Sequence, residues 1–454
     1  MGGLVSDSEL REAQLSGSCP LRVAFSVYRG NPTSGGQGVY TKYLSRELQS
    51  LGHHVEVFSG QPYPEVDFSI RLTEVPSLDL YRPDDPFRIP KLREFRNSWD
   101  LMEFAIMCTG GFPEPRIFGK RLYSLLSNRR PEFDILHDNQ SLSWSILRLQ
   151  AQGWPVVASI HHPITVDKKL GLDHADGFKE QFGVTRFYGF VRMQTKVANR
   201  LDHIITVSDT SARDISREMG IGRNKMRVVP VGVDPTTFRP IPDQARQPGL
   251  IVTTASADVP LKGLAVLVEA MQMLVAGGER PIVLKIMGQR RDDSPVQRSV
   301  ERLGLSPYVE FLGKVTQDEM VRLYSSASVA VVPSLYEGFS LPTIEAMACG
   351  APLVVSDGGA LPEVAGADGD CARVVRAGDA RALASAVSDL LHGPESAERM
   401  AHRAIIRARS RFSWRAAALG TVDRYLEALD GSPQHSAISV DSDFGVVDAK
   451  AADL

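Results

Sequence analysis

Hydrophobic residues along this chain recur in short runs that alternate with segments of helical spacing. In the first half the runs of strand length read LRVAFSV, HVEVFSG, FDILHD, PVVASI and DHIITVSD. The same rhythm restarts later with LIVTTAS, PIVLKIMG, YVEFLGKV and VAVVPS. Strands that alternate with helices predict a parallel sheet, because each crossover helix covers one face of it. We therefore expect an α/β fold with two doubly wound, Rossmann-like domains.

Breaks in this pattern set the expected domain boundaries. Residues 241–249, IPDQARQPG, combine proline, glycine and charge with no apolar period, which indicates a linker. The segment FSWRAAALGTVDRYLEAL carries Trp414, Ala418 and Tyr425 on one apolar stripe and is expected to form the last helix. Both ends of the chain are polar and aperiodic, which is typical of disorder. We expect a disordered leader over 1–19, a first domain over 20–242, a second over 243–411, a helix over 412–429 and a disordered tail over 430–454.

A glycine-rich turn follows the first predicted strand. Gly35, Gly36 and Gly38 free the backbone from side-chain restriction just before a helical pattern. A strand, a glycine turn and a helix can form a phosphate cradle, although such a turn also serves simply to pack a helix on a strand. An oxidoreductase would use this loop for a dinucleotide. The next strand ends in Ser59 and Gly60, with no carboxylate for a ribose hydroxyl, which weighs against that function.

Polar residues gather where two further strands of the first half end. Asp138 and Asn139 follow one strand, and His161 and His162 follow the next. The carboxyl ends of parallel strands open on the same side of a sheet, so both groups are expected on the side of the glycine turn. Either histidine could also simply finish its strand.

Two loops of the second half suit a phosphate. Lys262 stands directly before a helical pattern, where an ammonium group and the free N–H groups of a helix N-terminus would converge. Further on, the strand VAVVPS leads through LYEGFS to a helix that begins LPTIEAMA, with Pro342 in its first turn. In an open parallel sheet both loops would line the ligand crevice.

Two carboxylates flank the second loop. Glu337 lies in the loop and Glu345 lies one turn into the helix, so both can face the crevice from different heights. Carboxylates accept pairs of hydrogen bonds, which suits the vicinal hydroxyls of a sugar or a ribose. Glu337 could instead cap the helix and Glu345 could be merely solvated. The whole string, with Gly338 allowing close backbone approach and an apolar Phe339, favours a ligand site.

The string EGFSLPTIE, followed by EAMACGAPLVVSDGGALPEV, resembles the nucleotide-sugar signature of family-four retaining glycosyltransferases, which have the two-domain GT-B fold. The resemblance extends, with gaps, from about Leu21 to about Leu429. It implies a GT-B architecture with an interdomain cleft. It also implies a hexosyltransferase-type enzyme that moves a sugar from a nucleoside diphosphate sugar to an acceptor hydroxyl, with retention at the anomeric carbon and no cofactor besides this co-substrate.

The resemblance also implies roles for individual residues. In the family, the glutamate matching Glu337 contacts the donor sugar, the glutamate matching Glu345 contacts the ribose, and the lysine matching Lys262 binds the diphosphate. A histidine after the strand PVVASI reaches the donor sugar, which favours His161 over His162. We therefore expect catalysis by His161, Lys262 and Glu337, donor binding by Gly36, Gly38, Gly288, Val315, Gly338, Phe339, Ser340, Leu341 and Glu345, an acceptor side at Asp138 and Asn139, and no metal ligands.

One position departs from the family pattern. Members usually carry an arginine a few residues before the phosphate lysine, where this chain has Ala255, Ser256 and Ala257. Another cation would have to supply that contact. The departure leaves open a catalytically degenerate scaffold that only binds a sugar nucleotide. A nucleotide-sugar epimerase or hydrolase on the same fold is a further alternative.

Composition excludes several other classes. A formal charge of −3, with 51 basic and 54 acidic residues, argues against a nucleic-acid partner. The four cysteines show neither metal-ligand spacing nor a disulfide framework, which is typical of a reducing compartment. No signal-peptide pattern and no membrane-length apolar run are present in the sequence. These features predict a cytoplasmic protein, with peripheral contact at the inner membrane face as an option.

Two weakly patterned stretches are expected to concern the acceptor, which could be a small molecule, a glycan or a lipid-linked sugar. Residues 61–116 are rich in proline and aromatic residues and are expected either to set acceptor specificity or to form a surface insertion. Residues 176–200 are expected to form one long helix with a basic face. That face could attract an anionic membrane or a phosphorylated acceptor, or could simply be solvated.

Overall fold

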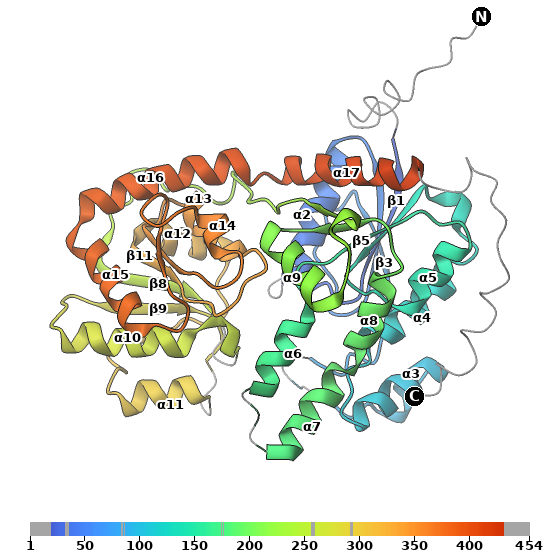
Figure 1. Ribbon diagram of the computed structural model, residues 1–454, viewed down its shortest axis with the longest axis horizontal. Coiled ribbons are helices and arrows are strands. Elements are labelled where there is room, and N and C mark those ends of the chain that lie inside the picture. Colours follow the sequence, from blue (N-terminus) through green and yellow to red (C-terminus); the bar gives the residue numbers. More distant parts are fainter. Residues whose placement is uncertain are drawn as a thin grey trace, which may run out of the picture.

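The protein is described by a computed structural model that covers residues 20–31, 36–82, 85, 87–173, 175, 177–255, 259–290 and 294–430. The expected leader and nearly all of the expected tail lie outside these residues. Gly35, Ser256 and Ala257 also lie outside them. Two lobes lie side by side in Figure 1, each built around a sheet covered by helices.

The N-terminal lobe contains a parallel sheet of seven strands within the described residues. The spatial order is β3-β2-β1-β4-β5-β6-β7, and β1 lies in register between β2 and β4, with Val27 opposite both Ser59 and Asn139. The residues that follow β1, β2, β4 and β5 therefore meet at one edge. The strands are β1 (Arg22–Val27), β2 (His54–Ser59), β3 (Arg71–Glu74), β4 (Ile135–Asn139), β5 (Val156–Ser159), β6 (Ile204–Thr206) and β7 (Met226–Val228).

The C-terminal lobe repeats this plan. In the part of the chain that the structure describes, six parallel strands follow the order β10-β9-β8-β11-β12-β13. The first of them, β8, begins inside the expected linker 241–249, so residues 247–249 belong to the strand. The strands are β8 (Gln247–Thr254), β9 (Val283–Met287), β10 (Val309–Phe311), β11 (Ala327–Val332), β12 (Leu353–Ser356) and β13 (Arg373–Val375). The predicted α/β architecture with two parallel sheets is confirmed.

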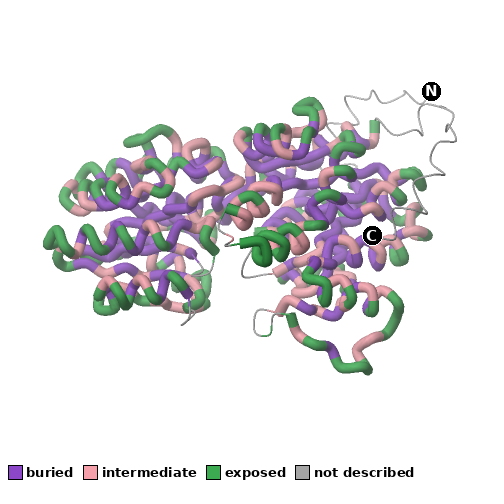
Figure 2. Tube along the Cα trace, turned by 60° about the horizontal axis from the view of Figure 1, so that its bottom comes forward, coloured by how far each residue is buried: buried purple, intermediate pink, exposed green. Residues whose placement is uncertain are grey.

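Helices cover both faces of each sheet, and buried residues concentrate along the strands between them (Figure 2). The helices of the N-terminal lobe are α2 (Gln37–Ser50), α3 (Ser98–Cys108), α4 (Glu114–Leu126), α5 (Trp144–Ala151), α6 (Ile164–Asp173), α7 (Gly177–Phe187), α8 (Val191–Ala198) and α9 (Asp209–Met219). Those that follow are α10 (Leu264–Ala276), α11 (Pro295–Arg302), α12 (Gln317–Ser326), α13 (Leu341–Ala348), α14 (Leu361–Ala365), α15 (Ala380–His392), α16 (Pro394–Arg411) and α17 (Trp414–Asp430).

The last two helices connect the lobes. α16 lies along the C-terminal lobe, and α17 continues along the N-terminal lobe at the top of Figure 1. Trp414 stacks on Tyr43 of α2 with ring centroids 5.3 Å apart. The hydroxyl of Tyr425 lies 2.6 Å from Nδ1 of the buried His137 on β4. These contacts make α17 part of the N-terminal core.

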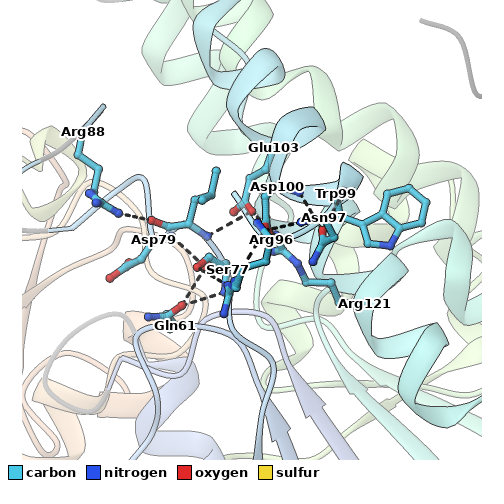
Figure 3. A network of polar contacts seen from close by, with 11 residues as sticks. Gln61, Ser77, Asp79, Arg88, Arg96, Asn97, Trp99, Asp100, Glu103 and Arg121 are labelled. Carbon is cyan, nitrogen blue, oxygen red and sulfur yellow. Dashed lines mark hydrogen bonds and ion pairs between the residues drawn. The ribbon is translucent and has the colours of Figure 1, made fainter. Parts of the chain in front are cut away.

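The irregular stretch after β2 is held together by ion pairs beneath the surface (Figure 3). Nη2 of Arg121 lies 2.5 Å from both Asp100 Oδ1 and Glu103 Oε2, and all three side chains are buried. A buried ion pair is costly to break because the remaining charge would lack a partner. The network therefore fixes α3 and its flanking loop onto α4.

The expectation of a single helix over 176–200 is wrong. α7 ends at Phe187, a 3₁₀ turn follows over Tyr188–Phe190, and α8 then begins. The rings of Phe187 and Phe190 each lie 5.3 Å from the ring of Phe112. A 3₁₀ turn places residues i and i+3 on the same side, which allows both rings to contact Phe112. Among the described residues, no helix is long and apolar enough to span a bilayer.

Candidate active site

The loop between β11 and α13 is fixed by backbone contacts from its neighbours. Leu335 N–H donates to Leu261 O at 2.7 Å, and Ala360 N–H donates to Glu337 O at 2.8 Å. A Cβ on Gly359 would lie 2.2 Å from Glu337 O, so only glycine allows this approach. The loop is therefore clamped between the segments that follow β8 and β12.

Lys262 and Glu337 meet at the centre of this arrangement. Lys262 Nζ lies 2.6 Å from Glu337 Oε1, and Ser334 Oγ donates to the same oxygen at 2.8 Å. The Lys262 side chain is 33% exposed and that of Glu337 is 11% exposed, so the ammonium remains accessible to solvent. A cation and an acceptor of hydroxyl hydrogen bonds thus stand side by side, which suits a sugar diphosphate.

The position of Lys262 depends on the glycine that follows it. Gly263 has φ 65°, in the left-handed region, and directly precedes α10 as its N-cap. A Cβ at this position would lie 1.9 Å from Pro333 O. The glycine therefore lets the lysine turn lie directly against the end of β11.

Gly338 brings the loop between β11 and α13 into contact with the N-terminal lobe. Its carbonyl accepts hydrogen bonds from Ser208 Oγ at 2.7 Å and from Ser211 Oγ at 2.9 Å, at the start of α9. A Cβ on Gly338 would lie 2.6 Å from His161 O. The two lobes are therefore in direct contact at the loop that holds Glu337.

Phe339 and Ser340 shape the backbone of the loop and do not present exposed side chains. The Phe339 ring is buried and packs edge-to-face on Phe412, with centroids 5.4 Å apart. This ring faces the core, so only the backbone of Phe339 is placed to serve a ligand. Ser340 has φ 90°, an uncommon value for a residue with a Cβ. It precedes Leu341, the first residue of α13, whose early N–H groups have no partner within the helix.

Glu345 lies half-buried in α13, below this helix start. Burial raises the pKa of its carboxyl group to about 7. Burial, and to a smaller extent the charge of Glu345, raise the pKa of Tyr324 in α12, whose hydroxyl lies 2.9 Å from Thr254 Oγ1. In this partly buried position the ionised carboxylate would be stabilised by hydrogen bonds from the hydroxyl groups of a ligand.

The raised pKa of Glu345 predicts a pH-dependent effect of Glu345→Gln on stability. The folded state holds the proton more tightly than the unfolded chain does. The favourable contribution is thus complete below pH 4.5 and is lost as pH rises from 4.5 to 7. Glutamine never ionises, so the variant does not lose this contribution at high pH. The difference in melting temperature between variant and wild type should therefore be about 2–4 °C more in favour of the variant at pH 8 than at pH 4.5.

Thermal unfolding at both pH values measures this difference. Glu395→Gln, on a side chain that is 93% exposed, controls for the loss of one negative charge. An equal gain in both variants would contradict the burial of Glu345.

In the N-terminal lobe, His161 is held by Asn139 at the end of β4. His161 Nε2 lies 2.7 Å from Asn139 Oδ1, while Asn139 Nδ2 donates to Thr41 Oγ1 and Gln37 O. The amide orientation makes Nε2 the protonated nitrogen and leaves Nδ1 as the ring's acceptor. Burial, with a smaller contribution from the charge of His162, lowers the pKa of His161 to about 3. The imidazole is therefore neutral in the physiological range.

His162 lies within reach of the charges of Glu337 and Lys262. Its Nε2 lies 2.9 Å from Asp167 Oδ2. Burial opposes protonation, but Asp167 and the charge of Glu337 outweigh it and raise the pKa of His162, with Lys262 acting against them. The structure thus couples His162 electrostatically to the Lys262–Glu337 pair, although the sequence favoured His161.

Asp138 does not face an open acceptor site. Its side chain is fully buried, and its oxygens accept hydrogen bonds from Ser141 Oγ at 2.5 Å, Leu142 N at 2.7 Å and Ser26 Oγ at 3.2 Å. Burial raises its pKa to about 6 despite these partners. We correct the expected acceptor role accordingly: Asp138 positions the turn after β4, and the neighbouring Asn139 orients His161.

The remaining predicted positions lie along the same edges. Gly36 directly precedes α2 as its N-cap with φ 67°, and a Cβ there would meet no atom within 4 Å. A Cβ on Gly38 would lie 1.9 Å from Asn31 O, so this glycine is needed for packing. Gly288 directly follows β9, and Val315 follows β10 and packs on the core. No group of three or more metal-ligating side chains is found among the described residues.

Sequence reasoning missed several residues that hold the site. Ser334 and the glycine pair 358–359 support Glu337, and Ser208 and Ser211 bind Gly338. The pair 358–359 begins the motif GGALPE, which the sequence shows plainly but to which no role was assigned.

The chain is similar to known glycosyltransferases along most of its length. Residues 34–237 match the model for Glycosyltransferase Family 4, and residues 242–407 match that for Glycosyl transferases group 1. An MMP alpha-(1->4)-mannosyltransferase from Mycolicibacterium hassiacum is 44% identical, over 90% of this chain and 98% of that protein. A D-inositol 3-phosphate glycosyltransferase 2 from Catenulispora acidiphila is 28% identical, over 91% of this chain and 96% of that protein.

Solved structures share the fold. Sucrose-phosphate synthase from Thermosynechococcus elongatus superposes with a TM-score of 0.70 at 22% identity, covering 91% of this chain and all of that one. Anabaena HepE in complex with UDP-glucose gives a TM-score of 0.64 at 16% identity, covering 90% of this chain and 99% of that one. Two parallel-sheet lobes, these neighbours and the family models confirm the expected GT-B fold and hexosyltransferase-type activity. The chain belongs to the group 1, family 4 glycosyltransferases.

Proposed function

We propose that this protein transfers a mannosyl group from a nucleoside diphosphate mannose to a hydroxyl of a glycan acceptor, with retention at the anomeric carbon. The observation that carries the proposal is the Lys262–Glu337 pair at 2.6 Å beside the start of α13. The 44% identity to an α(1→4)-mannosyltransferase supports mannose as the sugar. An α-linked product from an α-configured sugar diphosphate requires retention.

We call the loop between β11 and α13, residues 333–340, the donor loop; its residues and their neighbours would each have a separate role. Lys262 and the amides from Gly338 to Leu341 stabilise the negative charge that grows on the leaving diphosphate. Glu337 accepts hydrogen bonds from sugar hydroxyls, and Glu345 accepts them from the ribose. As the bond from the anomeric carbon to the phosphate oxygen breaks, the acceptor oxygen bonds to that carbon. Its proton passes to the departing phosphate, so neither glutamate needs a covalent role.

Residues of the N-terminal lobe would orient the donor sugar. His161 is neutral and fixed by Asn139, so its ring can serve as a hydrogen-bond partner to the sugar without adding charge. The contact of Gly338 with α9 closes the lobes over the donor. Closure excludes water, which matters because hydrolysis of the sugar diphosphate competes with transfer.

Mass spectrometry of reactions with GDP-mannose, UDP-glucose and ADP-glucose tests this function, with mannose oligosaccharides as acceptors. We expect a product one mannose longer from GDP-mannose, and turnover that continues in EDTA because Lys262 and the loop amides supply the positive charge. Incubation with donor alone separates the alternatives. An altered donor sugar would indicate an epimerase, free mannose at the rate of transfer would indicate a hydrolase, and nucleotide binding without turnover would indicate a scaffold.

A further inference from the structure

Glu363, in the motif GGALPE, contacts the opposite lobe. Its Oε1 accepts a hydrogen bond from Asp209 N at 2.9 Å, and its Oε2 accepts from Thr210 N at 3.0 Å and Thr210 Oγ1 at 3.1 Å. These are the first two amides of α9, which have no partner within their own helix. A carboxylate is favoured at this end of a helix by charge as well as by hydrogen bonding. One side chain of the C-terminal lobe thus caps a helix of the N-terminal lobe.

The backbone behind Glu363 is held rigidly in its own lobe. Arg407 of α16 donates from Nη2 to Glu363 O and from Nε to Val364 O, both at 2.8 Å. These bonds satisfy carbonyl groups at the end of the short helix α14, which otherwise lack partners. If the Glu363 carboxylate is displaced, the whole of α14 is therefore expected to move with it, because the backbone of Glu363 is fixed within that helix.

The other end of this segment holds the donor loop. Ala360 N–H donates to Glu337 O at 2.8 Å, and Gly359 lies directly against the same carbonyl. The backbone of Glu337 and the carboxylate of Glu363 are therefore attached to opposite ends of one short segment, 359–363. Movement of α14 relative to α9 must move the loop that carries Glu337.

The start of α9 receives the donor loop through further bonds. Ser208 and Ser211 donate to Gly338 O, and Tyr336 donates its hydroxyl to Asp214 Oδ2 at 2.9 Å. Residues on both sides of Glu337 thus contact the same helix that Glu363 caps. All these groups can bind water when the lobes separate, so the contact is suited to repeated opening and closing.

We propose that Glu363 is a positioning residue that couples closure of the lobes to the placement of Glu337 for sugar transfer. This inference rests on the proposed function. Glu363 itself touches neither the donor nor the acceptor. Its hydrogen bonds to Asp209 and Thr210 form only in the closed arrangement, and they fix the donor loop through α14 at the moment when water is excluded.

Steady-state kinetics with GDP-mannose and X-ray scattering in the presence of GDP test this role. In Glu363→Ala we expect kcat to fall roughly 10- to 100-fold, because a small misplacement of catalytic groups is costly. GDP affinity, measured by calorimetry, should stay near that of wild type, because Lys262 and Glu345 are untouched. The radius of gyration with GDP should be larger than that of wild type, since the lobes close less completely.

Two further variants sharpen the test. Glu363→Gln keeps one acceptor oxygen but turns an NH₂ group toward a backbone donor, so its kcat should lie between those of wild type and Glu363→Ala. This near-isosteric variant also keeps the proposal testable if the alanine variant fails to fold. Glu398→Ala removes a glutamate that pairs with Arg246 within the C-terminal lobe, and its kcat should match wild type.

A wild-type kcat in Glu363→Ala would overturn the proposal. So would a loss of kcat with unchanged radius of gyration and a matching loss of GDP affinity. If the wild-type protein transfers no sugar from any donor, the proposed function fails, and the scattering comparison alone decides whether Glu363 controls closure.

Discussion

Replacing Lys262 with alanine is expected to lower the rate of sugar transfer roughly 100- to 1000-fold, the cost of losing one charge that stabilises a transition state. The ammonium lies 2.6 Å from Glu337 on a side chain that is 33% exposed, so it can stabilise the negative charge that would gather on the diphosphate of a donor. Its loss also leaves the Glu337 carboxylate, which is only 11% exposed, without a cation. Initial rates with GDP-mannose and an oligosaccharide acceptor measure the effect.

Two comparisons separate chemistry from folding in this experiment. Lys285→Ala removes a half-buried lysine that pairs with Glu310 at 3.5 Å in the same sheet, and its transfer rate should stay at the wild-type level. The double variant Lys262→Ala/Glu337→Gln removes both charges, so it should recover melting temperature lost in the single variant while remaining inactive. Near-normal turnover in Lys262→Ala would refute the assignment of the donor site.

Replacing Gly338 with alanine is expected to lower transfer by about 100-fold through a clash between the lobes. The new Cβ would lie 2.6 Å from His161 O and 2.9 Å from His162 Cβ, and the first of these atoms is backbone that cannot swing aside. The lobes would have to stay further apart. Because an open cleft admits water, the ratio of donor hydrolysis to transfer should rise as transfer falls.

The matched control is Gly183→Ala in α7, where a Cβ would meet no atom within 4 Å. Its transfer rate and hydrolysis ratio should equal those of wild type. Measuring both products by mass spectrometry, with thermal unfolding to verify folding, gives the comparison. Wild-type transfer by Gly338→Ala would show that the contact between the lobes is not required for turnover.

These predictions concern the two lobes together, while the sequence patterns concern each lobe separately. The alternation of strand and helix sufficed for two parallel sheets, because period and length of apolar runs are local properties. It also sufficed to place Lys262 and Glu337 at one edge, because loops that follow parallel strands share that edge. The 2.6 Å contact between them is consistent with that inference.

Other features depended on residues that are distant in sequence. Phe339 packs in the core because Phe412 lies beside it, and α7 gives way to a 3₁₀ turn where Phe112 packs against it. Asp138 is buried beside Ser26, which lies 112 residues earlier in the chain and donates a hydrogen bond to it. No local period carries this information.

The sequence by itself thus determined the elements and the sheet edges on which Lys262 and Glu337 lie. Only the tertiary structure decided which side chains are buried, how the lobes meet at Gly338 and what Glu363 contacts. The physical reason is that side-chain direction follows from whatever packs opposite, and at this site the opposing groups belong to the other half of the chain.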